Sequence, residues 1–275
     1  EQLAPNVIRF IDAVGMADIN EMMRADVFKK SAAVLVEFGS AEDDAAFAKF
    51  MAKNSGIEEA PRYAASYLWN ERLFGFKAKR MGPTLLASET IMPIASAAAF
   101  IAKAKKIGHH YGVEVCVDSY IIDSEKALLM TPFLCDSRKK KYYINLPLVE
   151  VLTKAAMGMG AEPYGLGLWN AAFIHGLYGS DRLREMKEYK TMVDPNNILN
   201  PGKGFSAAAN KLAAFVFSPP VFSPAMKLLG VMSPVVGGAS TAVLGRHNKI
   251  DNLDYELSMH ACAKCGNCIA VCPAY

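Results

Sequence analysis

The 275-residue sequence lacks several features that mark particular protein classes. Its net charge is only +3, too small to favour nucleic acid as a partner. Cysteine is scarce, with six residues, which argues against a disulfide scaffold. Charged residues make up only 21% and hydrophobic residues 52%, so the chain is neither disordered nor coiled coil as a whole. What remains is a folded chain with ample material for a hydrophobic core.

Strand and helix signals alternate over the first ~200 residues. Ser40, followed by three acids, is typical of a helix N-terminus, and Gly112 is placed to end a long Ala-rich helix. The predicted strands are 33–38, 85–92, 113–122 and 127–134, and the predicted helices are 42–53, 63–77, 94–111, 146–157, 170–177 and 181–192, with a glycine-rich loop at 158–167. This order predicts an α+β fold, a ferredoxin-like antiparallel sheet with helices on one face.

The composition divides the chain into three parts. Residues 1–205 form the predicted α+β domain, 206–252 a linker, and 253–275 the start of a helical iron–sulfur module. The linker contains two uncharged stretches, but prolines and glycines interrupt them. A membrane-spanning helix is therefore not expected there. Packing along the protein or a neighbouring subunit is the favoured interpretation, and contact with a membrane surface is the alternative.

Four of the six cysteines form one motif near the C-terminus. Cys262, Cys265, Cys268 and Cys272 follow the spacing C-x2-C-x2-C-x3-C-P. Three thiolates spaced in this way can hold three corners of a [4Fe–4S] cubane, while the fourth cysteine ligates a second cluster in two-cluster ferredoxins. Zinc is the alternative metal, but zinc sites usually need a second separated pair of cysteines. The spacing therefore predicts an iron–sulfur site.

A second cysteine run would be needed to complete a pair of clusters. The other two cysteines, Cys116 and Cys135, lie in predicted strands and are expected to be core residues. We therefore expect the polypeptide to continue past Tyr275, or a partner to complete the ligation. Because clusters and unpaired thiols favour reducing conditions, the expected location is cytoplasmic, with attachment to the inner membrane face as the alternative.

Three motifs together resemble a known family. These are D-P-x-x-I-L-N-P-G-K at 194–203, L-W-N-E-R at 68–72, and residues 89–93 opening a helix. The sequence over about 5–205 resembles the C-terminal half of the FAD-linked oxidases, the relatives of glycolate oxidase and D-lactate dehydrogenase. The resemblance implies a cap that covers the flavin and builds the substrate pocket, with FAD bound by a separate N-terminal domain that this sequence does not contain. Iron–sulfur modules are known behind this domain.

The sequence departs from metal-using members of that family. They carry G-H-x-G-D-G-N-x-H on a strand of the cap, where residues 113–123 here read V-E-V-C-V-D-S-Y-I-I-D. Their later S-G-E-H-G-x-G corresponds to A-E-P-Y-G-L-G at 161–167. The comparison predicts that the divalent-metal site of those members is absent.

Oxidation of a 2-hydroxy acid needs a cation for the carboxylate and a base for the hydroxyl proton. Arg72 matches the family's arginine after tryptophan and is the candidate carboxylate clamp. Tyr164, in the glycine-rich loop, and His175 are candidates for proton handling. Asn200 and Lys203 are expected at the interface with the flavin domain. Each also has a purely structural interpretation, as an ion pair, loop ring, structural histidine or local turn.

The leading hypothesis is part of a flavin- and iron–sulfur-dependent dehydrogenase. It would oxidise a small organic acid, similar to a 2-hydroxy acid, and pass electrons through [4Fe–4S] clusters to a redox protein or a quinone. The alternative is a non-catalytic electron-transfer and docking subunit, because the histidine-rich stretch is missing. A zinc-stabilised binding protein is a third interpretation.

Overall fold

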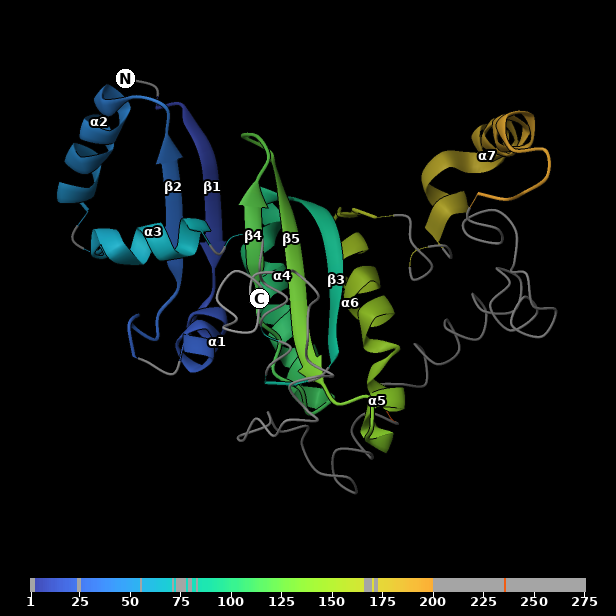
Figure 1. Ribbon diagram of the computed structural model, residues 1–275, viewed down its shortest axis with the longest axis horizontal. Coiled ribbons are helices and arrows are strands. Elements are labelled where there is room, and N and C mark those ends of the chain that lie inside the picture. Colours follow the sequence, from blue (N-terminus) through green and yellow to red (C-terminus); the bar gives the residue numbers. More distant parts are fainter. Residues whose placement is uncertain are drawn as a thin grey trace, which may run out of the picture. The chain divides into compact units, whose positions relative to one another are not determined.

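The computed structural model describes residues 3–23, 26–54, 56–70, 72, 78, 81–82, 84–165, 170, 173–199 and 235 (Figure 1). This part of the chain forms two compact units. The first contains its residues up to 87 and residues 113–139, and the second contains 88–112 and 140–199. Among the described residues, no helix is long and apolar enough to cross a membrane.

The strands and helices confirm the α+β fold with an antiparallel sheet. The elements are β1 (Pro5–Ile11), α1 (Ala13–Met23), β2 (Ala33–Phe38), α2 (Ala41–Ala52), α3 (Arg62–Asn70), β3 (Thr84–Pro93), α4 (Ile94–His110), β4 (Asp118–Ile121), β5 (Lys126–Cys135), α5 (Lys140–Asn145), α6 (Leu148–Met157), β6 (Glu162–Pro163) and α7 (Ile174–Val193). The strands are hydrogen-bonded in the order β2-β1-β4-β5-β3-β6.

Local signals in the first unit are confirmed closely. Strand β2 has the predicted bounds, and α2 lies one residue from its prediction. Ser40 caps α2, because its Oγ accepts a hydrogen bond of 3.1 Å from the Asp43 backbone N–H. The predicted strand at 113–122 is wrong in length. Only Asp118–Ile121 forms a strand, and Val115 contributes a single bridge to Phe133.

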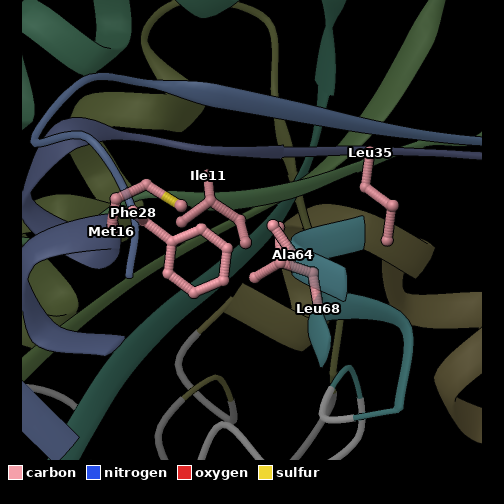
Figure 2. Packing of buried hydrophobic residues seen from close by; sticks show 6 residues of the cluster. All are labelled: Ile11, Met16, Phe28, Leu35, Ala64 and Leu68. Atoms are coloured by element: carbon pink, nitrogen blue, oxygen red, sulfur yellow. The ribbon is translucent and has the colours of Figure 1, made fainter. Parts of the chain in front are cut away.

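Helices α1 and α3 cover one face of β1 and β2. Figure 2 shows the buried cluster between them, in which side chains from two strands meet side chains from both helices and the loop after α1. The cluster consists of Ile11, Met16, Phe28, Leu35, Ala64 and Leu68. Phe28 also packs against Tyr67, with ring centroids 5.9 Å apart. Because burial of apolar surface is the main favourable contribution to folding, this cluster holds α3 on the sheet.

In the second unit, the part of β3 from Ser88 onward pairs with β6 and leads directly into α4. Ser88 and Thr153 share a buried hydrogen bond of 2.8 Å, which joins β3 to α6. Gly112 follows α4 with φ 66°, as its helix-ending role requires. Element α7 consists of two helical segments separated at Gly179, as the two helices predicted at 170–177 and 181–192 require. It is kinked at Gly179, whose φ of 70° and ψ of 172° are not helical.

Strand β5 has one fully buried face and one half-buried face. Ala127, Leu129, Thr131, Phe133 and Cys135 are buried. The residues between them, Leu128, Met130, Pro132 and Leu134, are only partly covered. We call these four residues the apolar stripe. Alternation of this kind reflects the two-residue period of a strand.

The two faces of β5 predict different responses to truncation. Leu129→Ala should lower the free energy of unfolding by about 2–5 kcal/mol, because it leaves a cavity in the core. Leu128→Ala removes the same atoms from the half-buried face and should cost about 1 kcal/mol. Urea unfolding of both variants beside the unsubstituted chain measures the difference. Equal losses would contradict the assignment of the two faces.

Candidate functional site

Arg72 lies just after α3 and is tied to the end of that helix. Its guanidinium stacks on Trp69, with Cζ 3.8 Å from the ring centroid. Its Nη1 donates to the Trp69 carbonyl oxygen at 2.5 Å, and its backbone N–H donates to the same oxygen at 3.3 Å. The last carbonyls of a helix have no partner within the helix, so these bonds cap α3. Arg72 is half-buried, and its guanidinium is held against a fixed ring.

Tyr120 on β4 holds the backbone of Arg72. Its hydroxyl donates to the Arg72 carbonyl oxygen at 3.2 Å. Burial, the largest effect, raises the pKa of Tyr120, so the hydroxyl remains a donor at neutral pH. Tyr120 stands directly opposite Arg9 on the neighbouring strand β1, and the Arg9 Cζ lies 5.5 Å from its ring centroid. Tyr120 therefore joins strand β4 to the residue that follows the end of α3.

Arg9 and Asp118 form a bidentate ion pair between β1 and β4, in which Arg9 is buried and Asp118 is partly covered. Arg9 Nε lies 2.9 Å from Asp118 Oδ1, and Nη2 lies 2.7 Å from Oδ2. The third nitrogen, Nη1, donates to the Leu68 carbonyl oxygen of α3 at 3.4 Å. Burial alone would lower the pKa of Arg9, but the hydrogen bond and charge of Asp118 outweigh it and raise that pKa. The arginine is therefore always charged and needs its partner.

Sequence reasoning missed Arg9, Asp118 and Tyr120. A charged residue inside each of two apolar strand patterns, N-V-I-R-F-I and V-C-V-D-S-Y, was the available signal. A charge on a buried strand requires a partner of opposite sign. Which arginine meets which aspartate could not be read from the pattern.

The apolar stripe lies on the same face of the sheet as Tyr120 and Asp118. Leu128 is the Cα partner of Tyr120, and Met130 is the partner of Asp118, so these side chains share a face. Helix α3 covers β1 and β2 on that face, while the stripe on β5 stays half-buried. The first unit thus carries a half-buried apolar surface on the face of Tyr120, whose hydroxyl holds the Arg72 backbone.

Tyr164 and His175 belong to the second unit, whereas Arg72 belongs to the first. Tyr164 follows β6 directly. Its side chain is 55% exposed, and its backbone N–H donates to the Glu89 carbonyl oxygen at 2.9 Å. His175 is exposed in the first turn of α7, where its Nε2 shares a hydrogen bond of 3.0 Å with Ser180 Oγ. Both side chains are therefore accessible from solvent.

The turn after α7 is organised by Asp194. Its carboxylate accepts hydrogen bonds from the backbone N–H groups of Ile198 and Leu199, at 2.8 and 2.9 Å, and pairs with Lys190. Lys190, the largest effect, and these backbone donors lower the pKa of Asp194. In the first half of the D-P-x-x-I-L-N-P-G-K motif, the aspartate therefore holds the backbone of the turn in place. Asn200 and Lys203 in its second half lie outside the described residues, as do Cys262, Cys265, Cys268 and Cys272.

Within the described ranges, no group of three or more His, Cys, Asp or Glu side chains could hold a metal ion. Cys135 is fully buried in β5, which confirms its expected place in the core. Burial, with a smaller effect of Asp136, raises the pKa of its thiol to about 12. Cys116 is partly covered, and burial raises the pKa of its thiol as well.

The described residues thus form an antiparallel α+β layer with a half-buried apolar surface and an arginine anchored at the end of a helix. Residues 1–204 match the family described as "FAD linked oxidases, C-terminal domain". The chain therefore belongs to this family, which confirms the resemblance seen in its motifs.

Two further proteins resemble the chain. It is 26% identical over 189 residues to "Glycolate oxidase subunit GlcD" of Bacillus subtilis, covering 67% of this chain and 36% of that protein. It is similar in structure to a 4-ethylphenol oxidase from Gulosibacter chungangensis, solved with isoeugenol, with a TM-score of 0.54 and 15% identity. That match covers 72% of this chain and 47% of the oxidase and shows a shared fold. The chain thus spans about a third of the first relative and half of the second.

The raised pKa of Cys135 predicts a thiol that resists alkylation. At pH 9.0 an ordinary cysteine is half ionised, whereas Cys135 stays protonated and out of solvent. Iodoacetamide followed by peptide mass spectrometry should find Cys135 unmodified in the folded protein and modified in denaturant. Labelling at equal rates in both states would contradict this.

Ionisation of Cys135 also links stability to pH. Because the pKa is higher in the folded state, the stabilising contribution is complete below the unfolded value of 9.0 and is lost as the pH rises toward about 12. Cys135→Ala should therefore flatten the fall in the urea midpoint over this window. An unchanged fall would show that another group causes it.

Proposed function

We propose that this chain is the cap of a flavin-dependent oxidoreductase that oxidises a small organic acid of the 2-hydroxy acid type. We further propose that its electrons leave through [4Fe–4S] clusters to a redox protein or a quinone. The observation that carries the proposal is the guanidinium of Arg72, which is stacked on Trp69, in a member of the FAD-linked oxidase family.

FAD is the group that the family implies, and the described residues fit a cover over it. A flavin ring needs an apolar surface with few charges, and the apolar stripe provides one on the face of the sheet that carries Tyr120. The stripe would contact the ring, while Asn200 and Lys203 would contact the domain that binds FAD. Bound FAD would supply a two-electron acceptor.

Arg72 binds the substrate carboxylate in this proposal. A guanidinium can pair with a carboxylate through two parallel N–H···O bonds, which fixes the position and the orientation of the acid together. The stack on Trp69 lowers the entropy lost on binding, because the side chain is already ordered. Oxidation then removes the hydroxyl proton of the acid. Tyr164 and His175 are the side chains we propose to hold or move it, since both are exposed.

The iron–sulfur part of the proposal rests on the donor set. Four cysteines in the spacing C-x2-C-x2-C-x3-C-P fit cubane clusters, with Cys262, Cys265 and Cys268 on one and Cys272 on a second. Bound clusters would supply one-electron transfer, which a flavin enzyme needs when its final acceptor takes electrons singly.

A docking subunit without catalysis is the second candidate. It is favoured by residues 113–123, which contain no histidine and contribute Asp118 and Tyr120 to structural contacts instead. Anaerobic mixing of the native protein with a panel of 2-hydroxy acids separates the two. Bleaching of the flavin absorbance by one of the acids supports catalysis, and no response to any acid supports docking.

Arg72→Lys tests the carboxylate clamp. Lysine keeps the charge but cannot form the bidentate fork, so kcat/KM for the oxidised acid should fall roughly 10- to 100-fold. Arg62→Lys, at the exposed start of the same helix, is the matched control and should leave kcat/KM within about twofold. Equal effects of the two variants would rule out a specific role for Arg72.

Cys265→Ser tests the cluster. It should reduce the iron bound per chain and the brown visible absorbance of protein purified without oxygen, because it removes one thiolate ligand. Cys135→Ala, in the core strand β5, should keep both. Colourless protein with bound zinc would overturn the iron–sulfur assignment, and so would unchanged iron in the Cys265 variant.

A further inference from the structure

We propose that Tyr120 is a positioning residue for Arg72. The ion pair between Arg9 and Asp118 in turn holds Tyr120 in place. The inference rests on the proposed function, because it gives Arg72 the role of carboxylate clamp. None of these three residues is expected to touch the substrate. They act by fixing the backbone from which the guanidinium projects.

The backbone of Arg72 is fixed at two points. Helix α3 ends at Asn70, so residue 72 is no longer held by the helical ladder. Its N–H donates to the Trp69 carbonyl oxygen, and its own carbonyl oxygen accepts from the Tyr120 hydroxyl at 3.2 Å. The first contact is local, but the second joins the residue to the sheet. Tyr120 thereby sets where Arg72 lies relative to β4.

The guanidinium of Arg72 lies on a fixed platform. Trp69 packs against the buried cluster of Figure 2, and the guanidinium stacks on its ring and uses Nη1 for the Trp69 carbonyl oxygen. The other edge of the guanidinium, formed by Nε and Nη2, has the geometry that pairs with both oxygens of a carboxylate. A shift of the backbone at residue 72 would tilt this edge away from a bound acid.

Tyr120 is held in place by its contact with Arg9. The Arg9 guanidinium contacts three groups at once: the Asp118 carboxylate, the Leu68 carbonyl oxygen and the Tyr120 ring. A buried ion pair gives little stability compared with apolar residues of the same size. Its directional bonds do fix geometry, and in this unit they fix the end of α3 relative to β1 and β4. This placement accounts for a charged pair in strands whose other residues on this face are mostly apolar.

Kinetics of the native protein provide the first test. Tyr120→Phe keeps the ring over Arg9 and removes only the hydroxyl. With an acid that the wild-type enzyme oxidises, KM should rise about three- to tenfold, as expected for one lost hydrogen bond, while kcat stays within about twofold. Tyr111→Phe is the matched control. Tyr111 is also buried, and among the described residues its hydroxyl has no partner. An unchanged KM in the Tyr120 variant would overturn the proposal.

A second readout works without activity and separates the two proposals. The chain has two tryptophans, so Trp169→Phe leaves Trp69 as the only emitting one. In the Trp169→Phe background, the further substitution Arg72→Ala should change the Trp69 emission and its quenching by acrylamide, because the stacked cation is lost. Tyr120→Phe should move both in the same direction, and Tyr111→Phe should not. If no acid is oxidised but this pattern holds, the proposed function fails and the positioning role stands. Unmoved emission in the Tyr120 variant contradicts positioning in either case.

Discussion

The ion pair between Arg9 and Asp118 is the contact on which the first unit depends. It joins two neighbouring strands, although Arg9 and Asp118 lie 109 positions apart in the chain. Removing one partner would leave an uncompensated charge inside the protein, which costs far more than the pair contributes. The pair also reaches Leu68 at the end of α3 and the ring of Tyr120. One interaction thus contacts two strands, the end of α3 and the tyrosine that holds the Arg72 backbone.

The two sides of β5 show how one strand serves folding and function together. Its buried side chains provide core contacts, while the apolar stripe stays half-buried on the face that carries Tyr120. Leaving apolar side chains partly exposed forgoes burial energy, and such surfaces often mark places where a ligand or partner is covered. In a member of the FAD-linked oxidase family, a flavin held by another domain is the ligand we propose for this surface.

Arg72 illustrates how a motif residue acquires a physical role. The L-W-N-E-R motif marks it only by position, and the structure shows why tryptophan stands three residues before it. The indole is at once a neighbour of the core cluster and a platform for the cation. Asp194 has a comparable double role in the D-P-x-x-I-L turn, where its carboxylate binds two backbone N–H groups and Lys190. The Arg72 side chain satisfies a carbonyl oxygen left open where α3 ends, whereas Asp194 satisfies N–H groups of the turn that follows α7.

The sequence by itself determined the elements whose signals are local. Ser40 with its acids begins α2, the β-branched run forms β2, and Gly112 ends α4, because caps and turns depend on neighbouring residues. The cysteine spacing and the family motifs are equally local. Only the tertiary structure decided β1, the ion pair and the contact of Tyr120 with Arg72. A buried arginine in a strand needs a partner of opposite charge. Because that aspartate is distant in the sequence, the residues around the arginine do not identify it.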